Sequence, residues 1–482
     1  MARLFISPLR AIVLLSVGLP SATAQVYKLG DRNDIVASAR MLAFDLMTFY
    51  DGNETGRVPG LLPGPPSEGL GDYYWGQAAH FWATFIDYWS ATGDETYNDL
   101  TTQGLLHQVG DSNDFSPFNQ TRTLSNDDQC GWGTVAMLAA ESRFPSPDGA
   151  PGWLSIAQNV FEQLAWRFDQ EEGGACGGGL RWSVLSQNQG YGFKQTQATG
   201  CFLNLAARLA RHTGNETYTN YADKSWDWMY NVGFIDDDTW RVYDGSHAEL
   251  NCTADSLIKT TFSVVISSIA QGSAFMYNQT QSDVWRNRTS NLTQRFLTDF
   301  VEDNGAFFEL PCERVTGQCK SDMLGFKGLA HRWLASSSQV APFLREKLLP
   351  ALRASAQTAV DQCTGGASSR QCGFYWSKGR FIDPEVDATT GLSEQMSVLG
   401  AVLSLLIPEV DAPALQSADP VGGSDNANGD EDEDERGNGN GSDDGNANNS
   451  TPDGGSGAGS LQGASLLATI AGVCALGVMS WC

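Results

Sequence analysis

Basic residues are scarce in this 482-residue chain, which has 30 Lys and Arg against 56 Asp and Glu and a formal net charge of −26. A nucleic-acid-binding protein needs a basic face for phosphate, so this balance argues against nucleic acid as a partner. Histidine is scarce too, with five residues and no H-E-x-x-H motif, which argues against a catalytic zinc ion. The G-x-S-x-G motif and the Gly-Lys-Ser/Thr ending of a phosphate loop are also absent. We therefore expect no cofactor.

Tight C-x-x-C spacing is missing as well, although the chain has ten cysteines. Two of them lie in an apolar C-terminal tail, and an even number of eight remains: Cys130, Cys176, Cys201, Cys252, Cys312, Cys319, Cys363 and Cys372. An even count favours disulfides in an oxidising compartment, with zinc binding as the alternative. Cys312 with Cys319, and Cys363 with Cys372, are close enough in sequence for local pairs. Eight cysteines allow 105 pairings, so the other partners stay open.

Both ends of the chain resemble processing signals. Residues 1–24 combine Arg3 and Arg10, an apolar stretch and a small-x-small site at Ala22-Thr23-Ala24, which predicts a secretory signal peptide. Residues 457–482 end the chain with a mostly apolar tail behind small residues, which predicts a GPI-attachment propeptide, with a transmembrane helix as the alternative. Residues 411–456, which precede this tail, are acidic and rich in Gly and Asn, and this composition predicts a disordered stalk.

Glycosylation sequons agree with export. Within residues 25–410, seven asparagines begin an N-x-S/T sequence, namely Asn53, Asn119, Asn215, Asn251, Asn278, Asn287 and Asn291. Attached glycans need exposed positions, so we expect these residues at the surface. Together with the terminal signals, they predict a secreted protein held at the outer leaflet of the plasma membrane by a GPI anchor, or in a cell wall.

Strand patterns are few, whereas apolar residues recur at helical spacing in six stretches rich in small residues. These stretches begin near Ala78, Trp132, Phe202, Phe262, Asp322 and Ser393. Six more amphipathic stretches alternate with them, near residues 34–50, 95–108, 155–168, 216–231, 282–300 and 341–361. Helices rich in small residues pack closely, so we expect the first six to form an inner ring.

Two joints between these stretches are alike, TGDETYNDL at 92–100 and TGNETYTNY at 213–221. Gly93 and Gly214 are suited to end one helix in a left-handed conformation, while Asp94 and Asn215 would cap the next. Such similarity suggests duplicated helical hairpins. Twelve alternating helices predict an all-α fold, an (α/α)6 barrel forming one domain over residues 25–410. An open solenoid is the alternative.

The segment with the clearest chemistry is SNDDQCGWGTVAMLAAE, residues 125–141, where Asp127 and Asp128 stand at a predicted helix start. Cleavage of a glycosidic bond needs two carboxyl groups, one to donate a proton and one to attack or support the anomeric carbon. Neighbouring carboxylates repel, which raises one pKa, and a helix N-terminus favours the carboxylate that stays ionised. Alternatively, an aspartate at a helix start is an ordinary cap.

Small and aromatic residues around the pair fit a sugar-binding site. Gly131 and Gly133 would leave room for a sugar ring, and Trp132 would offer a stacking face. Trp75 and Trp182 lie in or beside Gly-rich loops, where pockets are often built. Alternatively, these tryptophans belong to the core.

Several segments together resemble a known family. NDDQCGWGTVAMLAAE, YYWGQAAHFWATFIDYWSATGDETYNDL, CGGGLRW and GFKGLAHRWLA are similar to glycoside hydrolase family 76, the endo-1,6-α-mannanases, and its fungal GPI-anchored branch. The resemblance covers residues 26–408 and implies an (α/α)6 barrel, retaining chemistry and no metal. It makes Asp127 the nucleophile and Asp128 the general acid/base. It also implies cleft positions for Asn126, Gln129, Trp132, Gly178 and Trp182.

The resemblance also implies partners. The substrate would be α-mannan or the mannose of a GPI glycan, and wall glucan would be an acceptor if the enzyme transfers sugar in cell-wall assembly. A wall-anchored mannan-binding protein without turnover is the alternative from a different class. An inverting glycosidase with its base elsewhere is a third.

Overall fold

The structure, a computed structural model, describes residues 26–416. Within this range the chain forms twelve α-helices and one two-stranded antiparallel sheet. The helices are α1 (Arg32–Met47), α2 (Trp75–Thr92), α3 (Asn98–Gln108), α4 (Asn126–Ser142), α5 (Trp153–Gln170), α6 (Thr196–Thr213), α7 (Glu216–Asn231), α8 (Ser263–Thr280), α9 (Asp283–Asp299), α10 (Phe326–Val340), α11 (Arg345–Asp361) and α12 (Leu392–Leu403). The strands are β1 (Phe193–Gln195) and β2 (Gly245–His247), with Lys194 opposite Ser246.

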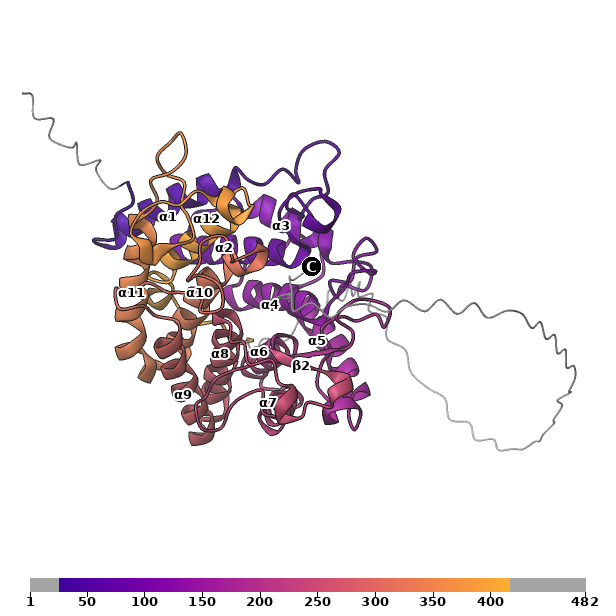
Figure 1. The fold of residues 1–482 in the computed structure, drawn as a ribbon. Coiled ribbons are helices and arrows are strands. Elements are labelled where there is room, and N and C mark those ends of the chain that lie inside the picture. The colour runs from indigo at the N-terminus through magenta and orange to yellow at the C-terminus, as the bar shows by residue number, and fades with distance from the viewer. Residues whose placement is uncertain (1–25, 417–482) are drawn as a thin grey trace, which may run out of the picture. The chain divides into compact units, whose positions relative to one another are not determined.

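The even-numbered helices form a closed inner ring. Helix α2 packs on α4, α4 on α6, α6 on α8, α8 on α10, α10 on α12, and α12 returns to α2. The odd-numbered helices flank this ring, and α7, α9 and α11 lie at the edge of the view in Figure 1. The ring closes, so the fold is the predicted (α/α)6 barrel, and the open solenoid is wrong.

Burial distinguishes the inner from the outer helices. In α8, 14 of 18 residues are buried, whereas in α9 only 5 of 17 are. A helix that is buried nearly all round belongs to the interior, and one with a single apolar stripe lies outside it. The six stretches rich in small residues all became inner helices, as predicted. The stretch near Asp322 begins with a 3-10 helix, η5 (Ser321–Gly325), before α10.

The two similar joints fold alike at the glycine and differently after it. Gly93 and Gly214 end α2 and α6 with φ of 70° and 72°, the left-handed cap that glycine favours. Asn215 caps α7 as predicted, by accepting a hydrogen bond from the Thr217 N–H. The predicted cap at Asp94 is wrong, because α3 begins only at Asn98. The Asp94 carboxylate instead accepts hydrogen bonds from the hydroxyl of Tyr88 and from Thr96.

All eight cysteines of the described part form disulfides. The predicted pairs Cys312–Cys319 and Cys363–Cys372 are confirmed, and zinc binding by these cysteines is thereby excluded. The two pairs left open are Cys130–Cys201, which joins the inner helices α4 and α6, and Cys176–Cys252, which joins two loops. Both join residues more than 70 positions apart, so no local spacing could have indicated them.

The barrel extends slightly beyond its predicted C-terminal boundary. The Ala414 N–H donates to the Glu141 carbonyl, and the Gln416 N–H donates to the His212 carbonyl, each at 2.8 Å. Residues 411–416, which were predicted to belong to the stalk, are therefore attached to the barrel. The predicted signal peptide, nearly all of the stalk and the GPI propeptide lie outside the described residues. Among residues 26–416, no helix is long and apolar enough to cross a membrane.

Most of the predicted glycosylation sites are accessible. Asn53, Asn119, Asn215, Asn251 and Asn287 are exposed, and Asn291 is half-buried. Asn278 differs, because its amide nitrogen donates to the Val340 carbonyl at 2.8 Å and its amide oxygen accepts from Arg211. A glycan on that nitrogen would compete with the hydrogen bond to Val340, so Asn278 fits the prediction least well.

Candidate active site

The first turn of α4 presents two adjacent carboxyl groups that do not serve as its cap. Ser125 is the N-cap, and its hydroxyl accepts a hydrogen bond from the Asp128 N–H. Asp127 and Asp128 follow in the first turn, and both side chains are half-buried. Ser125 therefore takes the capping role that was the alternative for the pair, so neither Asp127 nor Asp128 is needed as a cap.

The surroundings make the two carboxyl groups unlike. Burial raises the pKa of Asp127, but hydrogen bonds from Ser125 and from the N–H groups of Asp127 and Asp128 oppose the shift. Burial, together with repulsion from Asp127, raises the pKa of Asp128 to about 8. A carboxylate with several donors keeps its charge more easily than one with few. At neutral pH, the arrangement therefore favours ionised Asp127 beside protonated Asp128.

Two more carboxyl groups complete a carboxylate cluster of Asp127, Asp128, Asp244 and Asp322. Asp244 directly precedes β2, and Asp322 lies in η5. Burial and repulsion from Asp127 raise the pKa of each to about 7. No Lys or Arg of the described chain forms a salt bridge with any of the four. Unpaired buried carboxyls are costly to a fold and are typical of functional sites.

Several buried polar atoms near the cluster lack a hydrogen-bond partner among the described residues. They are the hydroxyls of Ser183 and Thr196, Gln197 Oε1 and Asp244 Oδ1. Ser183 pairs with Ser125 across a backbone bridge, and the Thr196 N–H donates to the Asp244 carbonyl. Buried polar atoms are normally satisfied, so an unsatisfied group of them suits a ligand rich in hydroxyl groups.

A small cavity of about 20 Å³ leads from Asp127 into the barrel. Gly131, Gln197 and Asn204 line it, and Trp333 of α10 also contributes. Gly131 leaves some of this space free, since a Cβ there would meet no atom closer than 3.8 Å. Gly133 does not, because a Cβ there would lie 2.6 Å from Val160. The prediction that both glycines make room for a sugar is therefore wrong for Gly133, which serves helix packing.

A third glycine makes room for Asp128 itself. Gly76 lies in the first turn of α2, and a Cβ at this position would come within 2.1 Å of Asp128 Oδ1. Any larger residue would displace the carboxyl group. The close approach of α2 and α4 thus fixes where Asp128 lies.

Asn126 and Gln129 flank the pair but are buried and fully engaged. Both amide oxygens accept hydrogen bonds from Arg167 of α5, at 2.5 and 2.6 Å. The amide nitrogen of Asn126 donates to the Arg181 carbonyl, and that of Gln129 donates to the Asp114 carbonyl, both at 2.8 Å. The predicted substrate contacts of Asn126 and Gln129 stay predictions, although both side chains are buried and both atoms of each amide have a protein partner.

Of the three tryptophans predicted to contact sugar, two lie in the core. Trp132 is completely buried and stacks on Trp75, with ring centroids 5.3 Å apart. Trp75 is buried as well, and its indole N–H donates to Gln108. Trp132 also packs on a second aromatic ring, so it offers no free face and its predicted stacking role is wrong. The sugar contact predicted for the buried Trp75 stays a prediction. Trp182 is half-buried, and its carbonyl accepts from the Asn126 N–H, so it remains a candidate beside α4.

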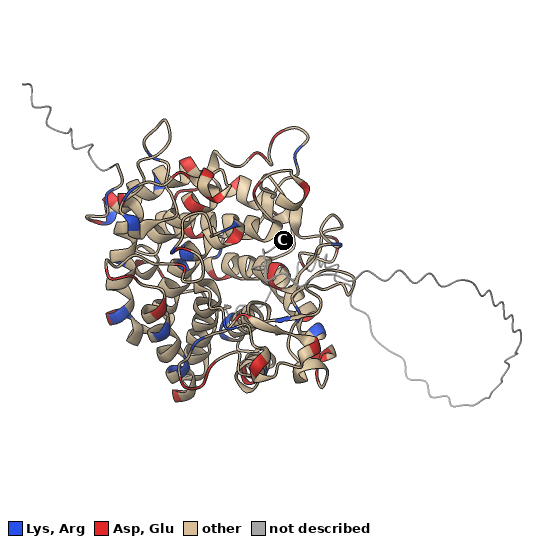
Figure 2. Ribbon diagram, in the orientation of Figure 1, with Lys and Arg blue, Asp and Glu red and all other residues tan. Residues whose placement is uncertain are grey.

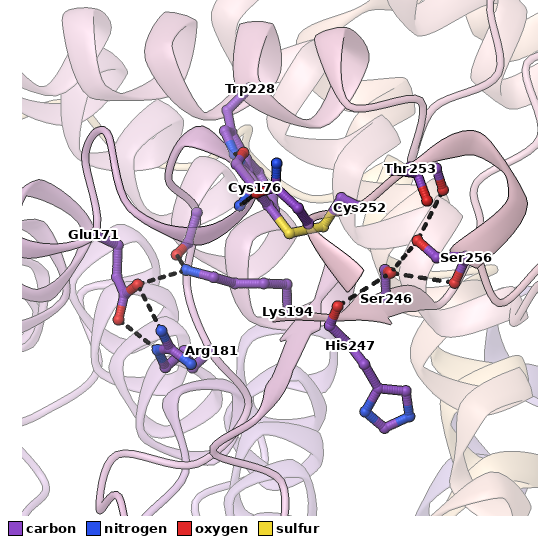
Figure 3. Close-up of a disulfide and its surroundings, with 12 residues drawn as sticks. Glu171, Cys176, Arg181, Lys194, Trp228, Ser246, His247, Cys252, Thr253 and Ser256 are labelled. Carbon is purple, nitrogen blue, oxygen red and sulfur yellow. Dashed lines mark hydrogen bonds and ion pairs between the residues drawn. A yellow bond between two sulfur atoms is a disulfide. The ribbon is translucent and has the colours of Figure 1, made fainter. Parts of the chain in front are cut away.

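The Gly-rich loop before Trp182 is shaped by packing. Gly178 is buried against Trp228, and a Cβ on Gly179 would lie 2.1 Å from that ring. Gly178 therefore contributes to packing, and its predicted substrate contact stays a prediction. Figure 3 shows the Cys176–Cys252 disulfide beside Trp228, and the Lys194 and Arg181 side chains reaching Glu171. These bonds fix the conformation of the loop, which contacts the first turn of α4 where Asn126 donates to the Arg181 and Trp182 carbonyls.

Sequence reasoning missed four residues of this site: Gly76, Arg167, Asp244 and Asp322. Asp244 and Asp322 are single carboxylates far apart in the chain, one before β2 and one in η5, so only the closed barrel brings them to Asp127. Gly76 directly follows Trp75 in the segment YYWGQ, which resembles the family, so its place in that segment was a signal for a role at the site. Within residues 26–416, no group of His, Cys, Asp and Glu is placed to hold a metal ion. Basic and acidic residues are interspersed along the ribbon in Figure 2.

Known proteins resemble this chain over most of its length. A family model described as glycosyl hydrolase family 76 matches residues 34–417. DCW1 of Saccharomyces cerevisiae, a mannan endo-1,6-alpha-mannosidase, is 37% identical over 389 residues, which are 80% of this chain and 81% of that protein. DCW1 of Candida glabrata, of the same name, is 36% identical over 424 residues, 87% of this chain and 89% of that protein.

Solved structures also resemble this chain over most of its length. The crystal structure of Dfg5 from Chaetomium thermophilum in complex with glucosamine is 48% identical, with a TM-score of 0.79, and the match covers 82% of this chain and 97% of that one. The α-1,6-mannanase of Salegentibacter sp. HEL1_6 is 16% identical with a TM-score of 0.60, over 78% of this chain and 99% of that one. At this identity the second likeness concerns the fold alone.

Proposed function

Since the chain belongs to glycosyl hydrolase family 76 and is a glycoside hydrolase, we propose that it cleaves α-1,6-linked mannose with retention, through a covalent intermediate on Asp127. The observation that carries the proposal is the pair at the start of α4, where one carboxyl is surrounded by donors and its neighbour has a pKa of about 8. Retaining glycosidases need one ionised and one protonated carboxyl group on either side of the scissile bond.

The roles follow from the two protonation states. Ionised Asp127 attacks the anomeric carbon while Asp128 gives its proton to the departing oxygen, so the glycosidic bond breaks as the ester bond forms. Asp128, now ionised, takes a proton from an incoming water or sugar hydroxyl. That oxygen attacks the anomeric carbon and releases Asp127. Water gives hydrolysis, and a sugar hydroxyl gives transfer.

The remaining site residues suit the sugar in the reacting position. Asp244 and Asp322 supply carboxyl oxygens near Asp127, and Ser183, Thr196 and Gln197 supply polar atoms without protein partners. Trp182 supplies an aromatic ring at the edge of the site. Mannose is the proposed sugar because the relatives from two yeasts are mannan endo-1,6-alpha-mannosidases.

The same reasoning extends to the setting of the reaction. The N-terminal signal, the small-residue site and the apolar tail support a secreted protein attached by a GPI anchor, and the exposed sequons support passage through the secretory pathway. We propose that the donor is α-mannan or the mannose of a GPI glycan on a surface protein, and that wall glucan is an acceptor. Ending the chain at residue 456 should release protein into the medium. Retention at the membrane would contradict the anchor.

Product analysis with a defined α-1,6-mannoside donor tests the reaction itself, with and without a β-glucan acceptor. We expect products in which the anomeric configuration is kept, and a mannosyl-glucan product when the acceptor is present. Products of inverted configuration would contradict the roles given to Asp127 and Asp128. Binding of mannan fragments without any product, in the wild type and in Asp128→Asn alike, would favour a non-catalytic binding protein.

A further inference from the structure

We propose that Arg167 is the positioning residue of this site, holding the first turn of α4 in the orientation that catalysis by Asp127 and Asp128 requires. The effect of Arg167 on turnover rests on the proposed function, whereas its hold on the first turn of α4 rests on hydrogen-bond geometry alone. Arg167 belongs to the outer helix α5 and does not touch the reacting carboxyl groups. It acts through the two residues that flank them.

The guanidinium of Arg167 spans the pair of aspartates. Nη1 donates to Asn126 Oδ1 at 2.5 Å, and Nη2 donates to Gln129 Oε1 at 2.6 Å. Asn126 and Gln129 are the residues immediately before and after the pair, and both are buried. The planar guanidinium offers two donors at fixed spacing, so it holds both ends of the short segment at once.

Each amide that accepts a hydrogen bond from Arg167 also donates one to another loop. With its oxygen turned to Arg167, the Asn126 amide directs its nitrogen to the Arg181 carbonyl, and the Gln129 amide directs its nitrogen to the Asp114 carbonyl. The loops on either side of the aspartates are thereby tied to one group. Losing that group would free both amides to rotate, and a shift of about 1 Å in a reacting group can cost on the order of 10²-fold in rate.

Arg167 also differs from two buried arginines of the inner helices. Arg208 and Arg332 each pair with a carboxylate, Glu141 and Asp87. In the described chain the side chain of Arg167 has hydrogen bonds to two neutral amide oxygens and none to a carboxylate. Burial lowers the pKa of Arg167 to about 10, although attraction to the Asp114 carboxylate opposes the shift. Two hydrogen bonds to Asn126 and Gln129, and no direct ion pair within residues 26–416, are therefore what the guanidinium of Arg167 contributes to the site.

Kinetics of three variants test the inference. Arg167→Met removes both donors, Arg167→Lys keeps the charge but reaches only one amide, and Arg208→Met is the control for losing a buried arginine far from the site. With an α-1,6-mannoside donor, we expect kcat of folded Arg167→Met to fall on the order of 10²-fold with KM changed less than about threefold. Arg167→Lys should lie between this variant and the wild type. Arg208→Met should keep the wild-type kcat in its folded fraction.

Two results would overturn the inference: a kcat of folded Arg167→Met within about threefold of the wild type, or an equal loss of kcat in folded Arg208→Met. Crystal structures of the wild type and Arg167→Lys give a test that needs no turnover. We expect the Asp127 and Asp128 carboxyl groups to be displaced in the variant, and unmoved groups would refute positioning. An inactive wild type would contradict the proposed function and leave this structural comparison decisive for Arg167.

Discussion

The carboxylates at the two ends of helix α4 differ in whether a cation pairs with them. Its first turn carries Asp127 and Asp128, which no cation pairs in the described chain, and its last turn carries Glu141, which is paired with Arg208 at 2.6 Å. Arg332 pairs with Asp87 near that second end. Burial raises the pKa of the acids in the carboxylate cluster, where no arginine compensates for it.

The covering of the two ends differs as well. Residues 407–416 lie over the paired end, where the Gln339 amide donates to the Ile407 carbonyl and Arg211 donates to the Pro413 carbonyl. A cavity of about 70 Å³ remains beneath this segment. The other end is built from Gly-rich and acidic loops. The comparison teaches that one helix can hold a carboxylate in a stabilising ion pair at its C-terminal end and leave carboxyl groups unpaired for chemistry at its N-terminal end.

The largest expected effect comes from removing one carboxylate at the unpaired end. We expect Asp127→Asn to lower kcat by about 10⁴-fold or more, because no other group can form the ester intermediate. Its thermal stability should not fall, since a repulsive charge is removed from the carboxylate cluster. Turnover of a defined α-1,6-mannoside and a melting curve would check both. A clear loss of stability with activity retained would reverse the assignment of the two ends.

The matched change at the paired end should have the opposite outcome. Asp87→Asn leaves the buried Arg332 without its partner, and we expect a loss of about 3 kcal/mol in the free energy of unfolding. The kcat of the folded protein should stay within about threefold of the wild type. Urea unfolding and kinetics at a temperature where the variant is folded would measure this. A stable variant with greatly reduced kcat would show that this end takes part in catalysis.

Two glycine substitutions sharpen the comparison without changing charge. In Gly76→Ala the new Cβ would collide with Asp128 Oδ1, so we expect kcat to fall roughly 10- to 100-fold through displacement of the acid. In Gly133→Ala the Cβ meets Val160, so we expect about 1–3 kcal/mol of destabilisation and little change in kcat. Equal effects of the two variants on kcat would remove the special place given to Gly76.

The pH dependence of activity should report the acid of the pair. Asp128 must be protonated to donate, so kcat/KM should decline roughly tenfold for each pH unit above about 8, the value to which burial and repulsion from Asp127 raise its pKa. A donor with an activated leaving group needs less protonation, so its decline should be shallower. An unchanged limb in Asp128→Asn would assign the limb to another group.

The smallest effect concerns stability. An acid whose pKa is higher in the folded than in the unfolded chain stabilises the fold below its unfolded pKa and loses that contribution as pH rises through its folded pKa. Burial and repulsion from Asp127 raise the pKa of Asp244 from 3.8 to about 7. Ionisation of Asp244 should therefore lower the free energy of unfolding between about pH 4 and 7. Asp244→Asn should flatten this decline, whereas Glu141→Gln should not. Unfolding curves at several pH values would compare the three proteins.

Local patterns in the sequence predicted the fold well. The helical spacing of apolar residues located all twelve helices, and the small residues of six of them identified the inner ring. The boundary errors have local causes. Asp94 binds Tyr88 and Thr96 instead of starting α3, and residues 411–416 are polar or small but are held by backbone hydrogen bonds to the barrel.

The site was predicted less completely, because its parts meet only in three dimensions. The Asp127–Asp128 pair was visible because its members are adjacent in sequence. Asn126, Gln129 and Trp132 are near the pair in sequence, and Trp75 and Gly178 lie in other motifs, but all five are buried. Whether a residue beside a site faces it or supports it depends on neighbours such as Arg167 and Trp228, which lie on other helices.

Covalent capture tests the central claim most directly. A mechanism-based mannoside inhibitor that leaves a stable ester should add one mannosyl group to the wild-type protein, and peptide mass spectrometry should locate it on Asp127. Asp127→Asn should take up no label, while the control variant Asp87→Asn should be labelled like the wild type. Labelling of another residue in the wild type, or undiminished labelling of Asp127→Asn, would contradict the account.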